Sequence, residues 1–181
     1  LHYLIKAFRN VATDKKLVIV GEGAFTDDYV KELKDLAKGD ERVIFTGSQY
    51  GDVLKELLSN AYLFVQPSES EGLSIALLEA MSYGKACLVS DIRENKEAIN
   101  NTGLAFRSKD TVDLTVKINE LLLDPIKVKT LGELAQKRAQ SEYNWENIVS
   151  ATEEVYATLL AAALARNFKR QSMAARISTL L

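Results

Sequence analysis

Glu71 and Glu79 are the residues whose type and spacing best suit the binding of a polar ligand. An ionised carboxylate accepts hydrogen bonds from two donors at once, so vicinal sugar hydroxyls are suitable partners. If the intervening chain were helical, the two acids would lie about 12 Å apart along the axis, and a loop shortens or bends that span. The pair is therefore suited to bracketing a small polar ligand, and less suited to sharing a proton.

The loop after Pro67 offers backbone groups that can bind an anion. The N–H groups of Gly72, Leu73 and Ser74 fall at the start of an apolar helical stretch, where they lack acceptors within the helix. Such a terminus favours phosphate oxygens, and Gly72 has no Cβ to keep a phosphate away from the backbone. The alternative is an ordinary helix start that Ser70 or Ser74 caps.

Glu79 itself lies in a helical stretch, 74–83, that is apolar on most sides. A buried carboxylate there costs several kcal/mol unless it is hydrogen-bonded or partly hydrated. A cleft containing sugar hydroxyls would meet that need. The alternative is that Glu79 points into solvent beside Ser82 and Tyr83, and Glu71 has the same alternative as a solvated loop residue.

Strands and helices that alternate along the chain must position these residues. Short apolar runs predict strands at 17–20, 43–46, 62–66, 86–90 and 103–106. Helical spacing predicts helices over 4–11, 27–38, 52–60 (with Asp52 as its cap), 74–83 and 93–100, and only helices from about 110 onward.

Strands that read as continuous apolar runs are expected to be buried on both faces. Separated by helices, they predict an α/β fold: a doubly wound parallel sheet with helices on both faces. Ligands of such folds bind beyond the carboxyl ends of the strands. Four loops lie there, at 21–25, 47–51, 67–73 and 90–95.

Composition excludes several classes of function. The 181 residues carry 23 basic and 25 acidic side chains, so the net charge of −2 gives no global reason to bind nucleic acid. Cys87 is the only cysteine, which excludes an internal disulfide and a cysteine zinc cluster, and we expect it to be a buried, inert thiol. The sequence shows no run of about 18 apolar residues, so we expect no membrane-spanning helix and a cytoplasmic protein.

The segment from Pro67 to Gly84 closely resembles the signature of the family-four (group-one) retaining glycosyltransferases. It reads Pro-Ser-x-x-Glu-Gly, five residues, then Leu-Glu-Ala-Met-x-x-Gly, with seven residues between Glu71 and Glu79. Further segments resemble the same family in order and spacing: Val18–Gly23, Val43–Gly47, Leu88–Glu97, Gly103–Phe106, Leu122–Pro125 and Tyr143–Glu146.

The resemblance implies a GT-B fold, with two Rossmann-like domains and a cleft between them. Residues 1–160 would be the nucleotide-sugar-binding C-terminal domain without its first strand, followed by a helical tail at 161–181. Glu71 would be the catalytic residue that contacts hydroxyls of the transferred sugar, and Glu79 would bind the ribose hydroxyls. The amides beside Gly72, those of Leu73 and Ser74, would lie against the diphosphate.

The resemblance also implies the rest of the donor site and the reaction. Gly21 and Gly23 would let the donor approach the sheet, and the backbone near Phe45 and Thr46 would face the base. The donor would be a UDP- or GDP-linked sugar, transferred with retention and without a metal or other cofactor. The family's Arg–Lys pair would fall just before Leu1, so we expect the chain alone to be inactive.

The acceptor would be a glycan or glycolipid that reaches the site through the missing N-terminal domain, and no nucleic acid partner is expected. The stretch from Tyr156 to Leu181 is apolar and then basic. It could pack against the missing domain, or contact anionic lipid at the inner face of the membrane. Alternative functions are a sugar phosphorylase, a nucleotide-sugar epimerase, or a non-catalytic α/β binding module.

Overall fold

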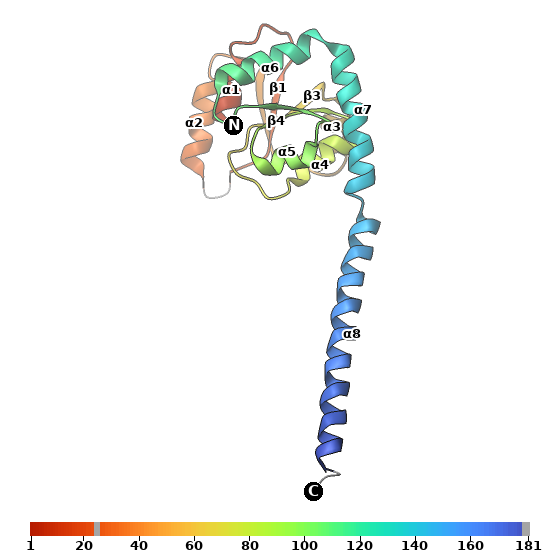
Figure 1. Cartoon of the computed structure of the whole chain (residues 1–181). Coiled ribbons are helices and arrows are strands. Elements are labelled where there is room, and N and C mark those ends of the chain that lie inside the picture. Colours follow the sequence, from red (N-terminus) through yellow and green to blue (C-terminus); the bar gives the residue numbers. More distant parts are fainter. Residues whose placement is uncertain (24–25, 179–181) are drawn as a thin grey trace. The chain divides into compact units, whose positions relative to one another are not determined.

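The computed structural model describes residues 1–23 and 26–178, with side chains described as far as Arg166. The chain divides into two compact units, Leu1–Gln140 and Ser141–Leu181 (Figure 1). The boundary expected at 160/161 falls inside a continuous helix.

The first unit alternates helices and strands, as predicted. Its strands are β1 (Leu17–Val20), β2 (Val43–Gly47), β3 (Leu63–Gln66), β4 (Ala86–Ser90) and β5 (Leu104–Phe106). Its helices are α1 (His2–Phe8), α2 (Asp27–Ala37), α3 (Gly51–Asn60), α4 (Ile75–Ser82), α5 (Arg93–Ile99), α6 (Thr111–Leu123) and α7 (Pro125–Glu142).

Two helix boundaries differ from the prediction. The first helix ends at Phe8, and the N–H of Val11 bonds back to the Phe8 carbonyl in a tighter turn. The third helix begins at Gly51 after Tyr50, so Asp52 lies in the first turn and makes no cap; the prediction that it caps this helix was wrong. Asp52 instead pairs with Lys55 one turn later.

The parallel strands form two separate ladders rather than the single sheet that was expected. β1 pairs with β2, and β4 pairs with β3 on one side and β5 on the other. Among the described residues no ladder joins β1 to β3, so one edge of each of these strands is unpaired.

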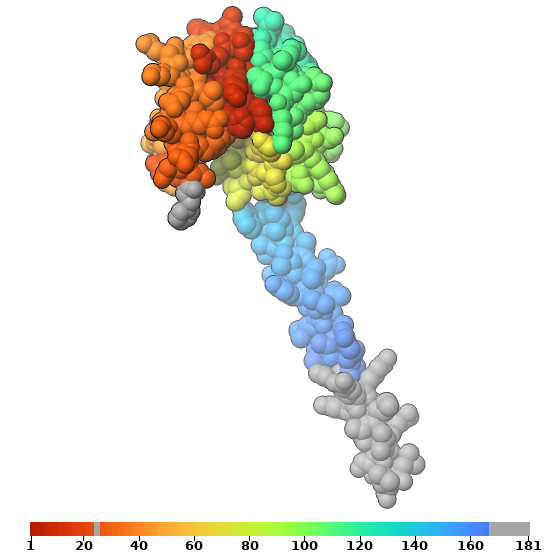
Figure 2. All heavy atoms as spheres, turned by 90° about the vertical axis from the view of Figure 1, so that its left-hand side faces the viewer, coloured from red at the N-terminus to blue at the C-terminus, as the bar shows by residue number. Residues whose placement is uncertain are grey.

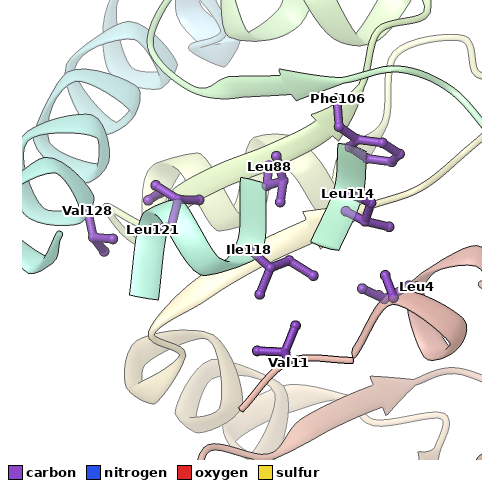
Figure 3. Packing of buried hydrophobic residues seen from close by; sticks show 10 residues of the cluster. Leu4, Val11, Leu88, Phe106, Leu114, Ile118, Leu121 and Val128 are labelled. Atoms are coloured by element: carbon purple, nitrogen blue, oxygen red, sulfur yellow. The ribbon is translucent and has the colours of Figure 1, made fainter. Parts of the chain in front are cut away.

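Strand β4 is buried on both faces, as its apolar sequence predicts. Ala86 and Leu88 belong to a cluster with residues of α1, α6 and α7 (Figure 3), whereas Cys87 and Val89 pack on the opposite face against α4, α5 and α7. Burial raises the pKa of the Cys87 thiol to about 12, so this thiol is the inert core residue that was expected.

Strands β1 and β2 do not follow this rule, which corrects the expectation that every strand is buried on both faces. Ile19 is buried against α1 and α2, but Val18, Val20 and Ile44 are each about 40% exposed. Helix α1 contacts both α2 and α6 and lies between them on the face shown in Figure 2. Val18 and Val20 alternate with Ile19 along the strand, so the face of the β1–β2 ladder opposite Ile19 is partly exposed.

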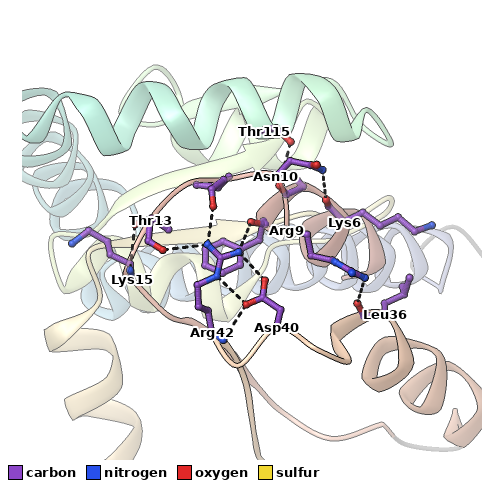
Figure 4. A network of polar contacts seen from close by, with 12 residues as sticks. Lys6, Arg9, Asn10, Thr13, Lys15, Leu36, Asp40, Arg42 and Thr115 are labelled. Atoms are coloured by element: carbon purple, nitrogen blue, oxygen red, sulfur yellow. Dashed lines mark hydrogen bonds and ion pairs between the residues drawn. The ribbon is translucent and has the colours of Figure 1, made fainter.

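Arg42 fixes the start of β2 to the chain that follows α1 (Figure 4). Its guanidinium donates to the carbonyls of Val11 (2.7 Å) and Thr13 (3.2 Å), and to both carboxylate oxygens of Asp40 (2.9 and 2.7 Å). These bonds lower the pKa of Asp40 to about 2. Asp40 is therefore an acid whose partner is supplied by the fold itself.

In the second unit the structure describes the long helix α8 (Trp145–Ser178). Several of its large apolar side chains are exposed: Trp145, Ile148, Val149, Val155, Tyr156, Leu159, Leu160 and Leu164. By length and composition, the described residues contain one helical segment that could cross a bilayer, within Pro125–Arg166; its mean hydropathy is 1.4 and none of it is buried. This segment contains no continuous run of about 18 apolar residues; it reaches this mean because alanines lie between the larger apolar residues, and the expectation of no membrane-spanning helix stays a prediction.

Candidate functional site

The loop between β3 and α4 holds the residues singled out from the sequence. β3 ends at the buried Gln66, and α4 begins at Ile75 after Ser74, whose Oγ accepts from the N–H of Leu77 at 3.3 Å. The expected cap is therefore Ser74. The N–H groups of Leu73 and Ser74 have no acceptor among the described residues, so they are free to bind an anion.

A hydrogen-bond network fixes the carboxylate of Glu71. Its Oε1 accepts from Nε2 of Gln66 at 3.0 Å and from Oγ of Ser68 at 2.6 Å. Oε1 of Gln66 in turn accepts from Oγ of Ser74 at 3.0 Å. Glu71 is half-buried, and the alternative of a freely solvated loop carboxylate does not describe it.

A second set of hydrogen bonds holds the loop through the backbone carbonyl of Ser68. Ser90, the last residue of β4, donates from Oγ to the carbonyl of Ser68 at 2.5 Å. Asn95 on α5 donates from Nδ2 to Oγ of Ser90 at 3.0 Å. Both Ser90 and Asn95 are about 1% exposed. Residues from two further elements at the carboxyl end of the sheet therefore position the loop.

Glu79 has a different environment. It is exposed, and no hydrogen bond or ion pair to its carboxylate occurs among the described residues. It shares the open face of α4 with Ala76 and Ile75, whose side chain is 74% exposed, while Leu77 and Met81 are buried on the opposite face. This exposed stripe runs from the N-terminal end of the helix to Glu79.

The three glycines of the candidate site differ in whether the chain itself requires glycine at that position. A Cβ added at Gly72 would meet nothing within 4 Å, so the chain itself does not require glycine there. Gly21 has φ of +127°, a conformation that L side chains rarely adopt. A Cβ at Gly23 would collide with Thr26 and Val30, so Gly23 is needed for the packing of α2. A role in admitting the donor remains a prediction for all three.

Phe45 and Thr46 lie near the carboxyl end of β2. Phe45 packs against the cluster around Ile19, and Oγ of Thr46 donates to the carbonyls of Ile19 (3.3 Å) and Gly47 (3.0 Å). The carbonyl of Thr46 accepts from Nε2 of Gln49 at 2.7 Å. One lone pair of that carbonyl is therefore used within the chain, and its role toward a base stays a prediction.

Positive charge near the loop is compensated within the chain. Nζ of Lys109, which follows β5, lies 2.7 Å from the carboxylate of Glu69, and this bond lowers the pKa of Glu69 and raises that of Lys109. In the part of the chain that the structure describes, no three or more His, Cys, Asp or Glu side chains cluster as a metal site would need.

Sequence reasoning missed four residues of the network: Gln66, Ser68, Ser90 and Asn95. A signal for two of them was present, because Gln66 and Ser90 are polar residues that end otherwise apolar strands. Polar groups at the carboxyl ends of parallel strands are placed where ligands bind.

The chain belongs to the group 1 glycosyl transferases, whose family model matches residues 1–138. The structure confirms the α/β fold that the resemblance implied. It places the signature segment, Pro67 to Gly84, at the carboxyl end of β3 in the β3–β4–β5 ladder.

Curated relatives carry different specificities. The chain is 32% identical to N-acetyl-alpha-D-glucosaminyl L-malate synthase of Bacillus anthracis, over 87% of the chain and 42% of that enzyme. It is 36% identical to the N,N'-diacetylbacillosaminyl-diphospho-undecaprenol alpha-1,3-N-acetylgalactosaminyltransferase of Campylobacter jejuni, over 82% of the chain and 39% of that enzyme. The chain thus spans well under half the length of these relatives.

Solved structures share the fold. Sucrose-phosphate synthase from Thermosynechococcus elongatus superposes with a TM-score of 0.77 at 27% identity, over 89% of this chain and 42% of that protein. Anabaena Alr3699/HepE, solved in complex with UDP-glucose, superposes with a TM-score of 0.78 at 24% identity, over 88% of this chain and 44% of that protein. Both proteins share the α/β fold of this chain, whose structural neighbours are GT-B glycosyltransferases.

Proposed function

We propose that this chain is the donor-binding half of a retaining glycosyltransferase that uses a nucleotide-diphosphate sugar, UDP- or GDP-linked. The observation that carries the proposal is a fixed carboxylate, Glu71, beside the open N-terminal end of α4, with an exposed stripe leading from there to Glu79. A diphosphate at the amides of Leu73 and Ser74 would separate a sugar near Glu71 from a ribose near Glu79.

The chemistry follows from this placement. In the transfer, the bond between the anomeric carbon and the diphosphate oxygen breaks, the acceptor oxygen bonds to the anomeric carbon on the same face of the sugar, and the proton of the acceptor hydroxyl passes to the leaving diphosphate. Negative charge grows on the leaving diphosphate, where preorganised N–H donors and the positive end of α4 stabilise it without a metal. The carboxylate of Glu71 acts by accepting hydrogen bonds from sugar hydroxyls, which orients the anomeric carbon.

The division of the sheet supports the view that the chain lacks a strand. In the common Rossmann-like strand order, 3-2-1-4-5-6, the first strand lies between the second and the fourth. The observed ladders, β2–β1 and β3–β4–β5, match this order with the central strand left out. We propose that an upstream segment fills this position and brings the basic pair expected before Leu1.

The acceptor belongs to the half of the enzyme that lies outside this chain. The Campylobacter relative is named for a lipid-linked sugar acceptor and the Bacillus relative for malate, so the acceptor varies within the family. We propose a glycan or lipid-linked acceptor at the cytoplasmic side, with the exposed apolar face of α8 covered by the missing domain rather than by lipid. Sedimentation with anionic liposomes tests this choice, because lipid binding by the chain would contradict it.

Titration calorimetry of the chain with UDP-glucose and GDP-glucose at millimolar concentration tests the proposal. We expect weak binding of at least one donor and no turnover, measured as release of UDP or GDP, because the basic pair and the acceptor domain lie outside this chain. The Glu79→Gln variant should bind more weakly, whereas Glu56→Gln, on the exposed surface of α3, should bind as wild type does. Failure of every nucleotide diphosphate to bind would contradict the proposal.

A further inference from the structure

The hydrogen bonds around Glu71 form one directional chain that starts at α4. The N–H of Leu77 donates to Oγ of Ser74, whose own proton goes to Oε1 of Gln66 at 3.0 Å. Nε2 of Gln66 then donates to Glu71 at 3.0 Å. Every donor in this series points toward the carboxylate.

The chemistry of the groups allows only one orientation of the Gln66 amide. If its oxygen and nitrogen were exchanged, the amide oxygen would face the Glu71 carboxylate, and neither group has a proton to donate to the other. Gln66 is 6% exposed, so no alternative partner from solvent is readily available. The side chain is therefore locked between the helix cap and the carboxylate.

The two oxygens of the Glu71 carboxylate are consequently not equivalent. Oε1 accepts from both Gln66 and Ser68, which fills its two lone pairs. Oε2 accepts from none of the described residues. Ser90 and Asn95 hold the Ser68 end of this arrangement through the Ser68 carbonyl.

We infer that Gln66 and Ser68 are positioning residues, which hold Oε1 of Glu71 so that Oε2 is the oxygen presented to a hydroxyl of the transferred sugar. This inference rests on the proposed function. It also links the two parts of the site, because the Ser74 cap that starts the diphosphate-binding helix is hydrogen-bonded through Gln66 to the sugar-binding carboxylate. In a low-dielectric interior such serial bonds polarise one another.

The inference predicts which part of the ligand each residue affects. Removing a donor to Oε1 loosens the carboxylate and should weaken the contact with the sugar, while the nucleotide contacts remain. The measurement is therefore the ratio of the dissociation constant for UDP to that for UDP-glucose, with GDP and GDP-glucose titrated as a parallel pair. A merely structural role would weaken the nucleotide and the sugar nucleotide alike and leave the ratio unchanged.

The variants are Ser68→Ala and Gln66→Leu, with Ser68→Thr to restore the hydroxyl. Matched controls are Ser59→Ala on α3, which removes an exposed hydroxyl, and Gln136→Leu on α7, which removes a bond to a backbone carbonyl outside the site. Thermal melting of each variant establishes that it folds. Ser68 is half-buried, so Ser68→Ala keeps the test decisive if the buried Gln66→Leu variant does not fold.

We expect Ser68→Ala and Gln66→Leu each to lower the ratio about threefold to tenfold, since each loses a hydrogen bond to a charged group, and to change UDP affinity less than about twofold. Ser68→Thr and the two controls should keep the wild-type ratio. An unchanged ratio in Ser68→Ala and in any folded Gln66→Leu, or a wild type that binds UDP-glucose no more tightly than UDP, overturns the inference. A wild type that binds no nucleotide at all overturns the proposed function itself.

Discussion

The two glutamates of the signature, Glu71 and Glu79, differ in how the protein holds them. Glu71 accepts two hydrogen bonds from side chains at the carboxyl end of the sheet and is half-buried. Glu79 lies on the open face of α4, exposed, with no bond to its carboxylate among the described residues. The fold supplies partners for the carboxylate of Glu71 and, among the described residues, none for that of Glu79.

This difference matches the two tasks that the proposed function gives these acids. A group near the reacting carbon must be held in place before the substrate arrives, because a small misplacement there costs rate. A group that binds ribose hydroxyls far from the reaction contributes affinity, and it can be ordered by the ligand. Preorganisation is therefore concentrated at Glu71, and the predictions below separate the two acids by what they bind.

The largest expected effect is at Glu79. Replacing it by Gln removes the charge that accepts from two hydroxyls, and we expect UDP and UDP-glucose to lose affinity together, each about tenfold to a hundredfold. Titration of both ligands measures this, with Glu56→Gln as the control. A normal affinity for UDP in Glu79→Gln would remove Glu79 from the ribose site.

A smaller and selective effect is expected at Glu71. Glu71→Gln keeps the size of the side chain but removes its negative charge. The new NH2 group lies either against the donors Gln66 and Ser68 or in the place of Oε2, so UDP-glucose should bind about tenfold more weakly. UDP should bind as tightly as it does to the wild type, because its proposed contacts lie at the N-terminal end of α4 and at Glu79. Equal losses for UDP and UDP-glucose would erase the distinction between the two acids.

Gly72, between the two acids, should show a modest effect on binding alone. A Cβ there meets no atom of the chain within 4 Å, so Gly72→Ala should keep the wild-type melting temperature. It should weaken UDP binding about threefold to tenfold if a phosphate approaches this backbone closely. Gly23→Ala provides the contrast: it should lower the melting temperature, because its Cβ would collide with Thr26 and Val30.

Asp40 is the reference for an acid that stabilises the fold alone, so replacing it should leave nucleotide binding unchanged. Its pKa in the folded state is about 2, below the ordinary value near 3.9, because Arg42 donates to it. The stability it contributes is therefore complete above about pH 4 and lost as the pH falls toward 2. Asp40→Asn should lower the melting temperature at pH 7, and its difference from wild type should shrink below pH 4. A constant difference over that range would contradict the role of the ion pair.

The sequence predicted the order of elements, the parallel α/β class and the position of the signature, because apolar runs and glycine stops are local signals. It also pointed to Ser74 as a cap and to Cys87 as a buried thiol. The sequence marked Gln66 and Ser90 as polar residues that end apolar strands, but it did not predict their contacts with Glu71 and Asn95. Those contacts bring together the end of β3, the end of β4 and α5, and depend on side-chain directions that spacing does not encode.

The prediction of one sheet buried on both faces was wrong for a related reason. β1 and β2 are apolar runs like β4, yet Val18, Val20 and Ile44 are partly exposed. An apolar strand requires cover, but its sequence does not say which segment provides it. Here the β1 edge of one ladder and the β3 edge of the other have no partner strand among the described residues.

A crystal structure of the chain with UDP-glucose bound tests the central claim most directly. The account predicts the diphosphate at the N–H groups of Leu73 and Ser74, the ribose hydroxyls on Glu79, and a glucose hydroxyl on Oε2 of Glu71, with Gln66 and Ser68 still on Oε1. A nucleotide bound away from the start of α4, or either acid turned to solvent in the complex, would contradict it.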